Sequence, residues 1–176
     1  QSAALLVVGG RRGDGAKPAV TRPGGDAEAP ETTRVKGAQR LTAYRKAGDG
    51  AERLAPGAAV RAGDVLQLRY DGGGRRHGLI ASIDGAGAVT LHFPASADGS
   101  TALAATTTDL PHAYALDDAP NFERFFFVTD DEPIDTAAAL GALRALARRR
   151  DADRAPLVLP PRVRQVTLLL RKAPAP

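Results

Sequence analysis

The chain has no cysteine, no methionine and no tryptophan, and aromatic residues make up only 5% of its 176 residues. The absence of cysteine excludes a disulfide framework and a thiolate zinc site. The scarcity of aromatic residues argues against a carbohydrate-binding sheet face and against a surface that stacks nucleic-acid bases. Because methionine is missing even at position 1, we expect the chain to be a mature or truncated product.

Lysine is also scarce, and arginine supplies most of the positive charge. The formal net charge is +4 and the isoelectric point is near 9.8, but the basic residues are scattered among acidic ones instead of forming one long block. The short runs Arg75-Arg76 and Arg148–Arg150 lack interleaved aromatic residues. We therefore expect solvated surfaces at these runs and no nucleic-acid partner.

The pattern of the chain predicts three segments. Residues 1–33 combine an apolar start, 1–10, with a Gly-, Pro- and charge-rich stretch that is typical of a flexible linker. The apolar start is too short to cross a bilayer; it fits either a short strand or the end of a membrane helix whose remainder is missing. Residues 34–172 form a single β-rich domain, and residues 173–176 form a disordered tail.

The firmest predicted unit is a β-hairpin over His77–Pro94. Apolar and polar residues alternate on both sides of a glycine-rich loop, Gly85-Ala86-Gly87. Placing Asp84 opposite Ala88 pairs the apolar residues across the two strands and puts all six on one face of the sheet. These pairs are Ile83 with Val89, Ala81 with Leu91, and Leu79 with Phe93.

Further strands are expected on both sides of this hairpin. In Phe122–Thr129, apolar residues occupy both faces, with Phe125 and Phe127 on one and Phe122, Phe126 and Val128 on the other, which indicates a central strand with cover on both sides. Asp71–Arg76 reads as an exposed connection and Thr101–Ala105 as a weak edge strand. The other predicted strands are Leu41–Lys46, Val65–Tyr70, a returning segment in Leu110–Asp118, and Arg162–Lys172.

One amphipathic helix is predicted over Ile134–Arg149. The acidic run Asp130-Asp131-Glu132 followed by Pro133 is typical of a helix start, and leucines at 140, 143 and 146 form one apolar stripe. A linker, 151–161, should follow it. The predicted fold class is therefore mainly β, an antiparallel two-layer sandwich with one packed helix near the C-terminus.

No catalytic, metal or cofactor residue is assigned from the sequence, and the binding residues stay unknown. His77, His92 and His112 could form a metal site with Asp84, Asp117 or Asp118, but the hairpin register places His77 and His92 on opposite faces. Ser82 is the one serine expected near a histidine, His92, and we expect a cross-strand contact there. The paired acids at 117–118 and 130–132 are expected to be structural.

The chain also resembles a known domain type. The strand start Gly63-Asp64-Val65-Leu66, the hairpin segment Ile83–Pro94 and the run Glu123–Phe126 before the helix resemble an uncharacterised bacterial domain of envelope-associated and regulatory proteins. Such domains follow membrane helices in anti-sigma-like proteins or lie beside kinase or caspase-like modules, and the resemblance implies a β-sandwich. The stretch His77-Gly78-Leu79 departs from an aromatic-rich pattern common in that family.

These features together predict a non-enzymatic extracytoplasmic (periplasmic) domain that senses or binds a protein partner. In the full-length protein it would be anchored at the inner membrane through the missing N-terminal helix, its only contact with the membrane. The alternative is a hydrolase that uses His92 or His112 with a nearby carboxylate. Function is expected on the loops Asp71–Arg76 and Ala95–Asp109.

Overall fold

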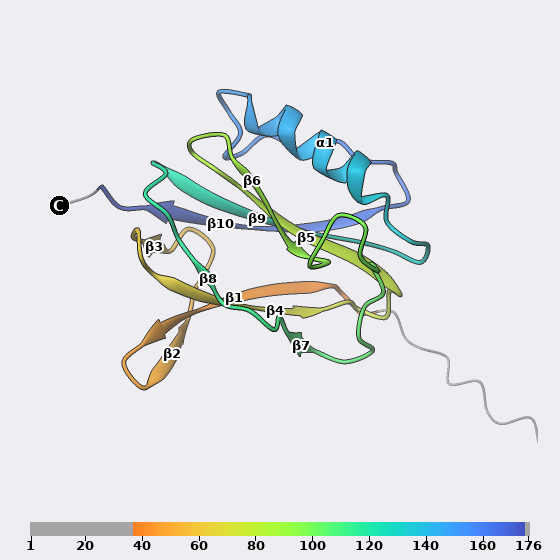
Figure 1. Ribbon diagram of the computed structural model, residues 1–176, viewed down its shortest axis with the longest axis horizontal. Coiled ribbons are helices and arrows are strands. Elements are labelled where there is room, and N and C mark those ends of the chain that lie inside the picture. The colour runs from red at the N-terminus through yellow and green to blue at the C-terminus, as the bar shows by residue number, and fades with distance from the viewer. Residues whose placement is uncertain (1–36, 175–176) are drawn as a thin grey trace, which may run out of the picture. The chain divides into compact units, whose positions relative to one another are not determined.

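The computed structural model describes residues 37–174 of the chain. Over this range the protein is mainly β, and two sheets face each other with one helix packed on the outside of one of them (Figure 1), which confirms the predicted fold class. The predicted strand or membrane-helix remnant and linker at 1–33, and the last two residues of the predicted tail, lie outside the described residues. No helix within 37–174 is long and apolar enough to span a membrane.

The first sheet has the strand order β2-β1-β4-β7, and β8 also pairs with β4. Its inner face comes from simple alternation in β4, where Leu66, Leu68 and Tyr70 are buried and the residues between them are partly exposed. Its strands are β1 (Arg40–Ala47), β2 (Gly50–Arg53), β4 (Val65–Asp71), β7 (Thr108–Asp109) and β8 (Tyr114–Ala115).

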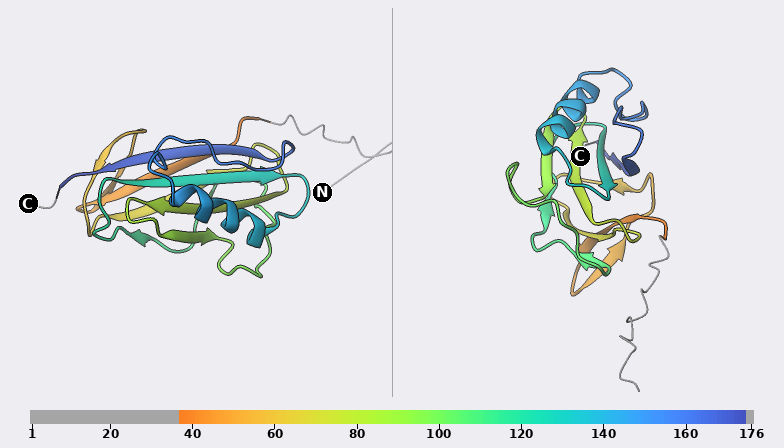
Figure 2. Two further views of the ribbon diagram at one scale, coloured as in Figure 1. Left: turned by 90° about the horizontal axis from the view of Figure 1, so that it is seen from above. Right: turned by 90° about the vertical axis from the view of Figure 1, so that its right-hand side faces the viewer.

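The second sheet has the strand order β3-β10-β9-β5-β6, antiparallel except for the short parallel pairing of β3 with β10. The helix α1 (Thr136–Ala147) lies across its outer face, as Figure 2 shows. Its strands are β3 (Ala59–Val60), β5 (His77–Asp84), β6 (Val89–Phe93), β9 (Phe122–Asp130) and β10 (Arg164–Lys172).

This second sheet separates two hydrophobic cores. Phe125 and Phe127 of β9 point into the core between the sheets, whereas Phe122, Phe126 and Val128 point into the core under α1. All nine residues of β9 are buried. The prediction of a central strand with cover on both faces is therefore confirmed.

The β5–β6 hairpin forms as predicted near its loop and differs at its open end. Gly87 has a φ of 85°, a left-handed conformation that favours glycine, and the amide of Asp84 donates to the carbonyl of Ala88. The pairs Ile83–Val89 and Ala81–Leu91 are confirmed. The pair Leu79–Phe93 is wrong, because a β-bulge at His92 brings Phe93 opposite Ile80 and turns its ring into the core between the sheets.

The helix also starts later than predicted. Asp135 is the N-cap residue, and its side chain accepts a hydrogen bond from the amide of Ala138 at 3.0 Å. The acids at 130–132 do not start the helix; they end β9 and form the turn after it, where arginines neutralise them. These ion pairs are Arg162–Asp130, Arg75–Asp131 and Arg76–Glu132.

Three connecting segments differ from their predictions. The loop Asp71–Arg76 is not a fully exposed connection, because Gly72 and Gly73 are buried and a Cβ on Gly73 would lie 2.4 Å from the carbonyl oxygen of Gly37. Thr101–Ala105 forms no strand; it contributes a single bridge between Ala102 and His77. The predicted linker 151–161 packs against the sheet, since Ala152, Ala155 and Leu157 are buried in the core under α1.

Candidate functional site

A cluster of charged side chains lies at one end of the sandwich. Asp84 ends β5, Glu123 lies at the start of β9, Lys172 ends β10, and Asp117 lies in the connection that follows β8. Glu123 and Asp84 are almost completely buried, with 1% and 4% of their surface exposed. Buried charges are costly unless they are paired, so the arrangement of this cluster needs a physical reason.

Strand alternation and register bring these residues together. Glu123 shares the inner face of β9 with Phe125 and Phe127, because side chains two residues apart point to the same side. Asp84 is directly opposite Glu123 in the β5–β9 register, and β10 pairs with β9 on its other side and ends next to Glu123. The inner face of this sheet is apolar along most of its length and becomes charged at this end.

Lys172 is the cation of the cluster. Its ammonium lies 2.7 Å from Oδ1 of Asp117, 3.0 Å from the backbone carbonyl oxygen of Asp117 and 3.6 Å from Oε2 of Glu123. Only 4% of the lysine side chain is exposed. The hydrogen bond from Lys172 lowers the pKa of Asp117, and the amide of Ala119 adds to this effect.

Glu123 is the most deeply buried acid of the cluster. Its Oε1 accepts a hydrogen bond of 3.2 Å from the hydroxyl of Tyr114, whereas its Oε2 is buried and has no hydrogen-bond partner. Burial raises the pKa of Glu123; the hydroxyl of Ser82 and the charge of Lys172 act against this, and the charge of Asp84 acts in the same direction as burial. Burial, followed by the charge of Glu123, raises the pKa of Tyr114 to about 12.

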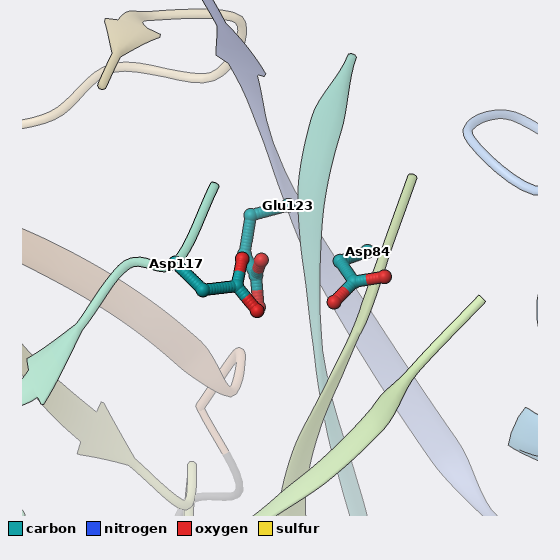
Figure 3. A group of neighbouring side chains, drawn as sticks. All are labelled: Asp84, Asp117 and Glu123. Carbon is teal, nitrogen blue, oxygen red and sulfur yellow. The ribbon is translucent and has the colours of Figure 1, made fainter. Parts of the chain in front are cut away.

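Asp84 is fixed by the hairpin loop. Its Oδ1 accepts hydrogen bonds from the amides of Ala86 at 2.8 Å and Ala88 at 3.0 Å. One oxygen each from Asp84, Asp117 and Glu123 lie within 4.8 Å of one another, and Figure 3 shows the carboxylate of Glu123 between the two aspartates. The protein therefore holds three carboxylates within the space that one bound cation would occupy.

A second polar contact lies next to this cluster, between β5 and β6. The hydroxyl of Ser82 lies 2.8 Å from Nε2 of His92, which confirms the predicted cross-strand contact. Burial lowers the pKa of His92 to about 4, and its ring packs against Tyr114 and Phe125. His92 is therefore neutral at pH 7 and is enclosed by aromatic rings.

The other predicted candidates lie apart. His77 contacts the hydroxyl of Thr101 through Nδ1 at 3.1 Å, and His112 is exposed in the connection before β8. The three histidines therefore do not converge on a metal site with Asp84, Asp117 or Asp118. Asp84 and Asp117 do come together, but their partner is a glutamate.

Glu123 and Lys172 were not predicted from the sequence to be members of a site. The available signal was the position of Glu123, because alternation places this carboxylate on the same face as Phe125 and Phe127. A charged residue on the buried face of a strand is unusual and points either to an ion pair or to a function. Lys172 carries no such signal, since it lies at the very end of its strand.

A second candidate surface is an apolar groove on the outer side of the second sheet. It lies between α1 and the segment 158–163 and has a volume of about 130 Å³. Val158 lines this groove with 81% of its surface exposed, and it is the one large apolar side chain that is exposed among the described residues. The lining residues are Val128, Asp130, Pro133, Ile134, Asp135, Ala138, Ala139, Ala142, Val158, Leu159, Pro160, Arg162 and Val163.

Comparison with known proteins gives no relative of this chain: no family model, no curated protein and no solved structure matches it.

Proposed function

We propose that this chain is a non-enzymatic interaction domain that binds an extended segment of a partner protein through the groove between α1 and residues 158–163. One large apolar side chain of the partner would fill the groove. The observation that carries this proposal is the groove itself, together with the exposed side chain of Val158. A partner side chain seated in the groove beside Val158 would remove apolar surface of both proteins from water.

The size and lining of the groove indicate what it would accept. An apolar cavity of about 150 Å³ is large enough for a benzene molecule, so a groove of 130 Å³ suits one aliphatic or aromatic side chain. The charged groups of the lining are Asp130, Asp135 and Arg162, and Arg162 is already paired with Asp130 at 3.0 Å. A neutral, apolar anchor therefore matches the groove better than a charged one.

The internal polar groups support a binding role over catalysis. Asp84 holds the hairpin loop, Asp117 is paired with Lys172, and His92 is bonded to Ser82 inside the sandwich. Each of these groups has a structural partner, and neither His92 nor Ser82 lines the groove.

We also propose that the domain lies outside the cytoplasm, on the basis of the sequence features of residues 1–33 and the resemblance to envelope-associated domains. Cell fractionation of the full-length gene product tests this location.

Selection from a random peptide library against the full chain tests the groove. We expect the enriched peptides to share one large apolar residue and to bind about tenfold more weakly to the variant Ala138→Arg, which places a long charged side chain in the groove. Binding would be measured by isothermal titration calorimetry. The matched control is Ala145→Arg, on the exposed side of the same helix and outside the groove.

Two outcomes would refute this proposal. Either no peptide family is enriched, or the enriched peptides bind Ala138→Arg and Ala145→Arg equally well. Circular dichroism of both variants establishes that they are folded, and this makes loss of binding attributable to the groove.

A hydrolase remains the second candidate, and the contact between Ser82 and a neutral His92 is the observation that favours it. Against it, Ser82 is buried, with 1% of its surface exposed, no carboxylate bonds His92 among the described residues, and His112 lies apart in an exposed connection. Assay of the parent chain and of His92→Gln and His112→Ala against a panel of esters and amides decides the matter, because a hydrolase requires activity in the parent that one of the two substitutions removes.

A further inference from the structure

The ammonium of Lys172 lies in a site built from oxygen atoms. Its neighbours are the backbone carbonyl oxygen and Oδ1 of Asp117 and, slightly farther away, Oε2 of Glu123. The carboxylate of Asp84 completes the same group. Carbonyl and carboxylate oxygens are the ligands that hard divalent cations use in proteins.

The charge of this site is not balanced by the lysine. Three carboxylates lie together, and the ammonium of Lys172 is paired with two of them, Asp117 and Glu123. In the ionised state the three carboxylates and the ammonium carry two negative charges in excess. A divalent cation in place of the ammonium would reduce this excess to one negative charge.

A second, independent observation points to a missing ligand. Oε2 of Glu123 is buried without any hydrogen-bond partner, and the ammonium at 3.6 Å lies beyond hydrogen-bond distance. Buried polar atoms in native proteins are nearly always satisfied, so each exception needs an explanation. An ion bound between Glu123 and the two aspartates would satisfy this oxygen.

The site borders a pocket on the side of Asp117 and Lys172, whereas Glu123 and Asp84 are buried behind them. A pocket of about 610 Å³ adjoins it and is lined by Lys172, Asp117, Asn121 and Arg61, among others. The side chain of Asp117 is 54% exposed on this side. The pocket offers a route for an ion, room for water ligands, and space into which the lysine side chain can swing.

We propose that Asp84, Asp117 and Glu123 form a calcium-binding site in which the ion competes with the ammonium of Lys172. Ligand oxygens of one calcium ion lie about 2.3–2.6 Å from it, so oxygens on opposite sides are up to about 5 Å apart. The three carboxylates meet this limit. Zinc prefers nitrogen and sulfur ligands, and magnesium demands a near-ideal octahedron at shorter distances. Calcium accepts irregular sets of oxygen ligands, so it is the ion that this all-oxygen group suits.

Titration of the full chain with calcium chloride by isothermal titration calorimetry tests this site, with magnesium chloride as the comparison. We expect a dissociation constant on the order of 10⁻⁴–10⁻³ M, the range of weak calcium modules, and weaker binding of magnesium. The variant Glu123→Gln keeps the shape of the side chain and should abolish binding. The variant Lys172→Met removes the competing ammonium and should tighten binding by about tenfold.

Asp109→Asn is the matched control, because Asp109 is a carboxylate that is paired with Arg69 in the first sheet. This variant should bind calcium as the parent chain does.

Terbium provides a readout that does not depend on the glutamine variant being folded. Tyr114, whose hydroxyl contacts Glu123, should sensitise terbium emission in the parent chain, calcium should displace the terbium, and Tyr114→Phe should lose the emission. The proposal is wrong if the parent shows neither calcium heat nor calcium-displaceable terbium emission, or if Lys172→Met binds calcium no more tightly than the parent.

Discussion

At the scale of single residues, the most informative side chains are polar groups inside an apolar fold. Arg124 shows how such a group is accommodated: its guanidinium donates to the carbonyl oxygens of Ala152 and Ala155 and lies over the ring of Phe126. A planar guanidinium with several donors can serve two acceptors at once. The arginine thereby fastens the segment after α1 to the sheet.

His92 makes the stability of the protein depend on pH. Its pKa is about 4 in the folded protein, against 6.5 for a histidine exposed to water, as in an unfolded chain. Between these values the unfolded chain binds a proton that the folded protein does not, so the free energy of unfolding should fall as the pH drops from 6.5 towards 4. The shift corresponds to about 3 kcal/mol at the acidic limit.

Urea unfolding of the parent and of His92→Gln over this pH range measures this effect. Glutamine can still hydrogen bond to Ser82 but does not titrate, so the difference in unfolding free energy between the two proteins should change in favour of the variant as the pH falls. A constant difference from pH 7 to pH 4 would contradict the assignment.

At the scale of elements, the tip of the β5–β6 hairpin is tightly packed against a neighbouring loop. A Cβ built on Gly85 would lie 1.7 Å from the carbonyl oxygen of Pro120, and the amide of Gly85 donates to the carbonyl of Phe122. Glycine is required here by the close approach of two backbones. This contact holds the loop that carries Asp117 next to the end of β5.

Gly85→Ala should therefore destabilise the protein by about 1–3 kcal/mol, because the loop must move to admit a methyl group. The matched control is Gly141→Ala in α1, where a Cβ meets nothing within 4 Å. Alanine is a better helix former than glycine, so this control should gain about 0.5–1 kcal/mol. Chemical denaturation gives both values, and equal effects of the two substitutions would show that the close approach is unimportant.

The sequence predicted elements whose signal is local and missed features that depend on distant partners. Alternation of buried and partly exposed residues in Val65–Tyr70, and apolar residues on both faces of Phe122–Thr129, were sufficient, because each pattern lies within a single strand. The bulge at His92 was not predictable, because Val89, Leu91 and Phe93 alternate in the sequence as they would in a regular strand, although the extra residue turns Phe93 to the opposite face. The acids at 130–132 were misassigned because their partners, Arg75, Arg76 and Arg162, come from other parts of the chain.

The candidate site was predicted only in part, for the same reason. Asp84 and Asp117 were considered as ligands together with histidines, but the ion pair of Asp117 with Lys172 joins two segments whose proximity depends on the whole sheet order. The groove near α1 was not predicted at all. It is formed by the segment 158–163, of which residues 158–161 were expected to be linker and residues 162–163 the start of the last strand; β10 starts only at Arg164, and the segment lies beside the helix.

At the scale of the whole molecule, the two sheets should differ in stability. All residues of β9 are buried and lie between β5 and β10, whereas all residues of β2 are exposed and β2 pairs with β1 at an edge of the first sheet. A strand that makes few buried contacts and whose backbone hydrogen bonds are exposed to water opens locally more readily than a buried strand does. We expect the amide hydrogens of β9 to exchange only through global unfolding and those of β2 to exchange through local opening.

Hydrogen exchange followed by mass spectrometry or NMR measures this difference. Protection in β9 should match the free energy of global unfolding, and protection in β2 should be lower by several orders of magnitude. Equal protection in the two strands would mean that the β1–β2 hairpin is as firmly bound as the central strand.

The positions of the two described chain ends have a mechanical consequence. Gly37 lies beside the start of β10, and Pro174 follows the end of the same strand, so the nine residues of β10 separate them by about 30 Å (Figure 1). Within a longer polypeptide, tension on these ends would act along the strands. Because β1 and β10 belong to different sheets, it would load the sandwich in shear, and the sheets would have to slide past each other before any strand could peel away.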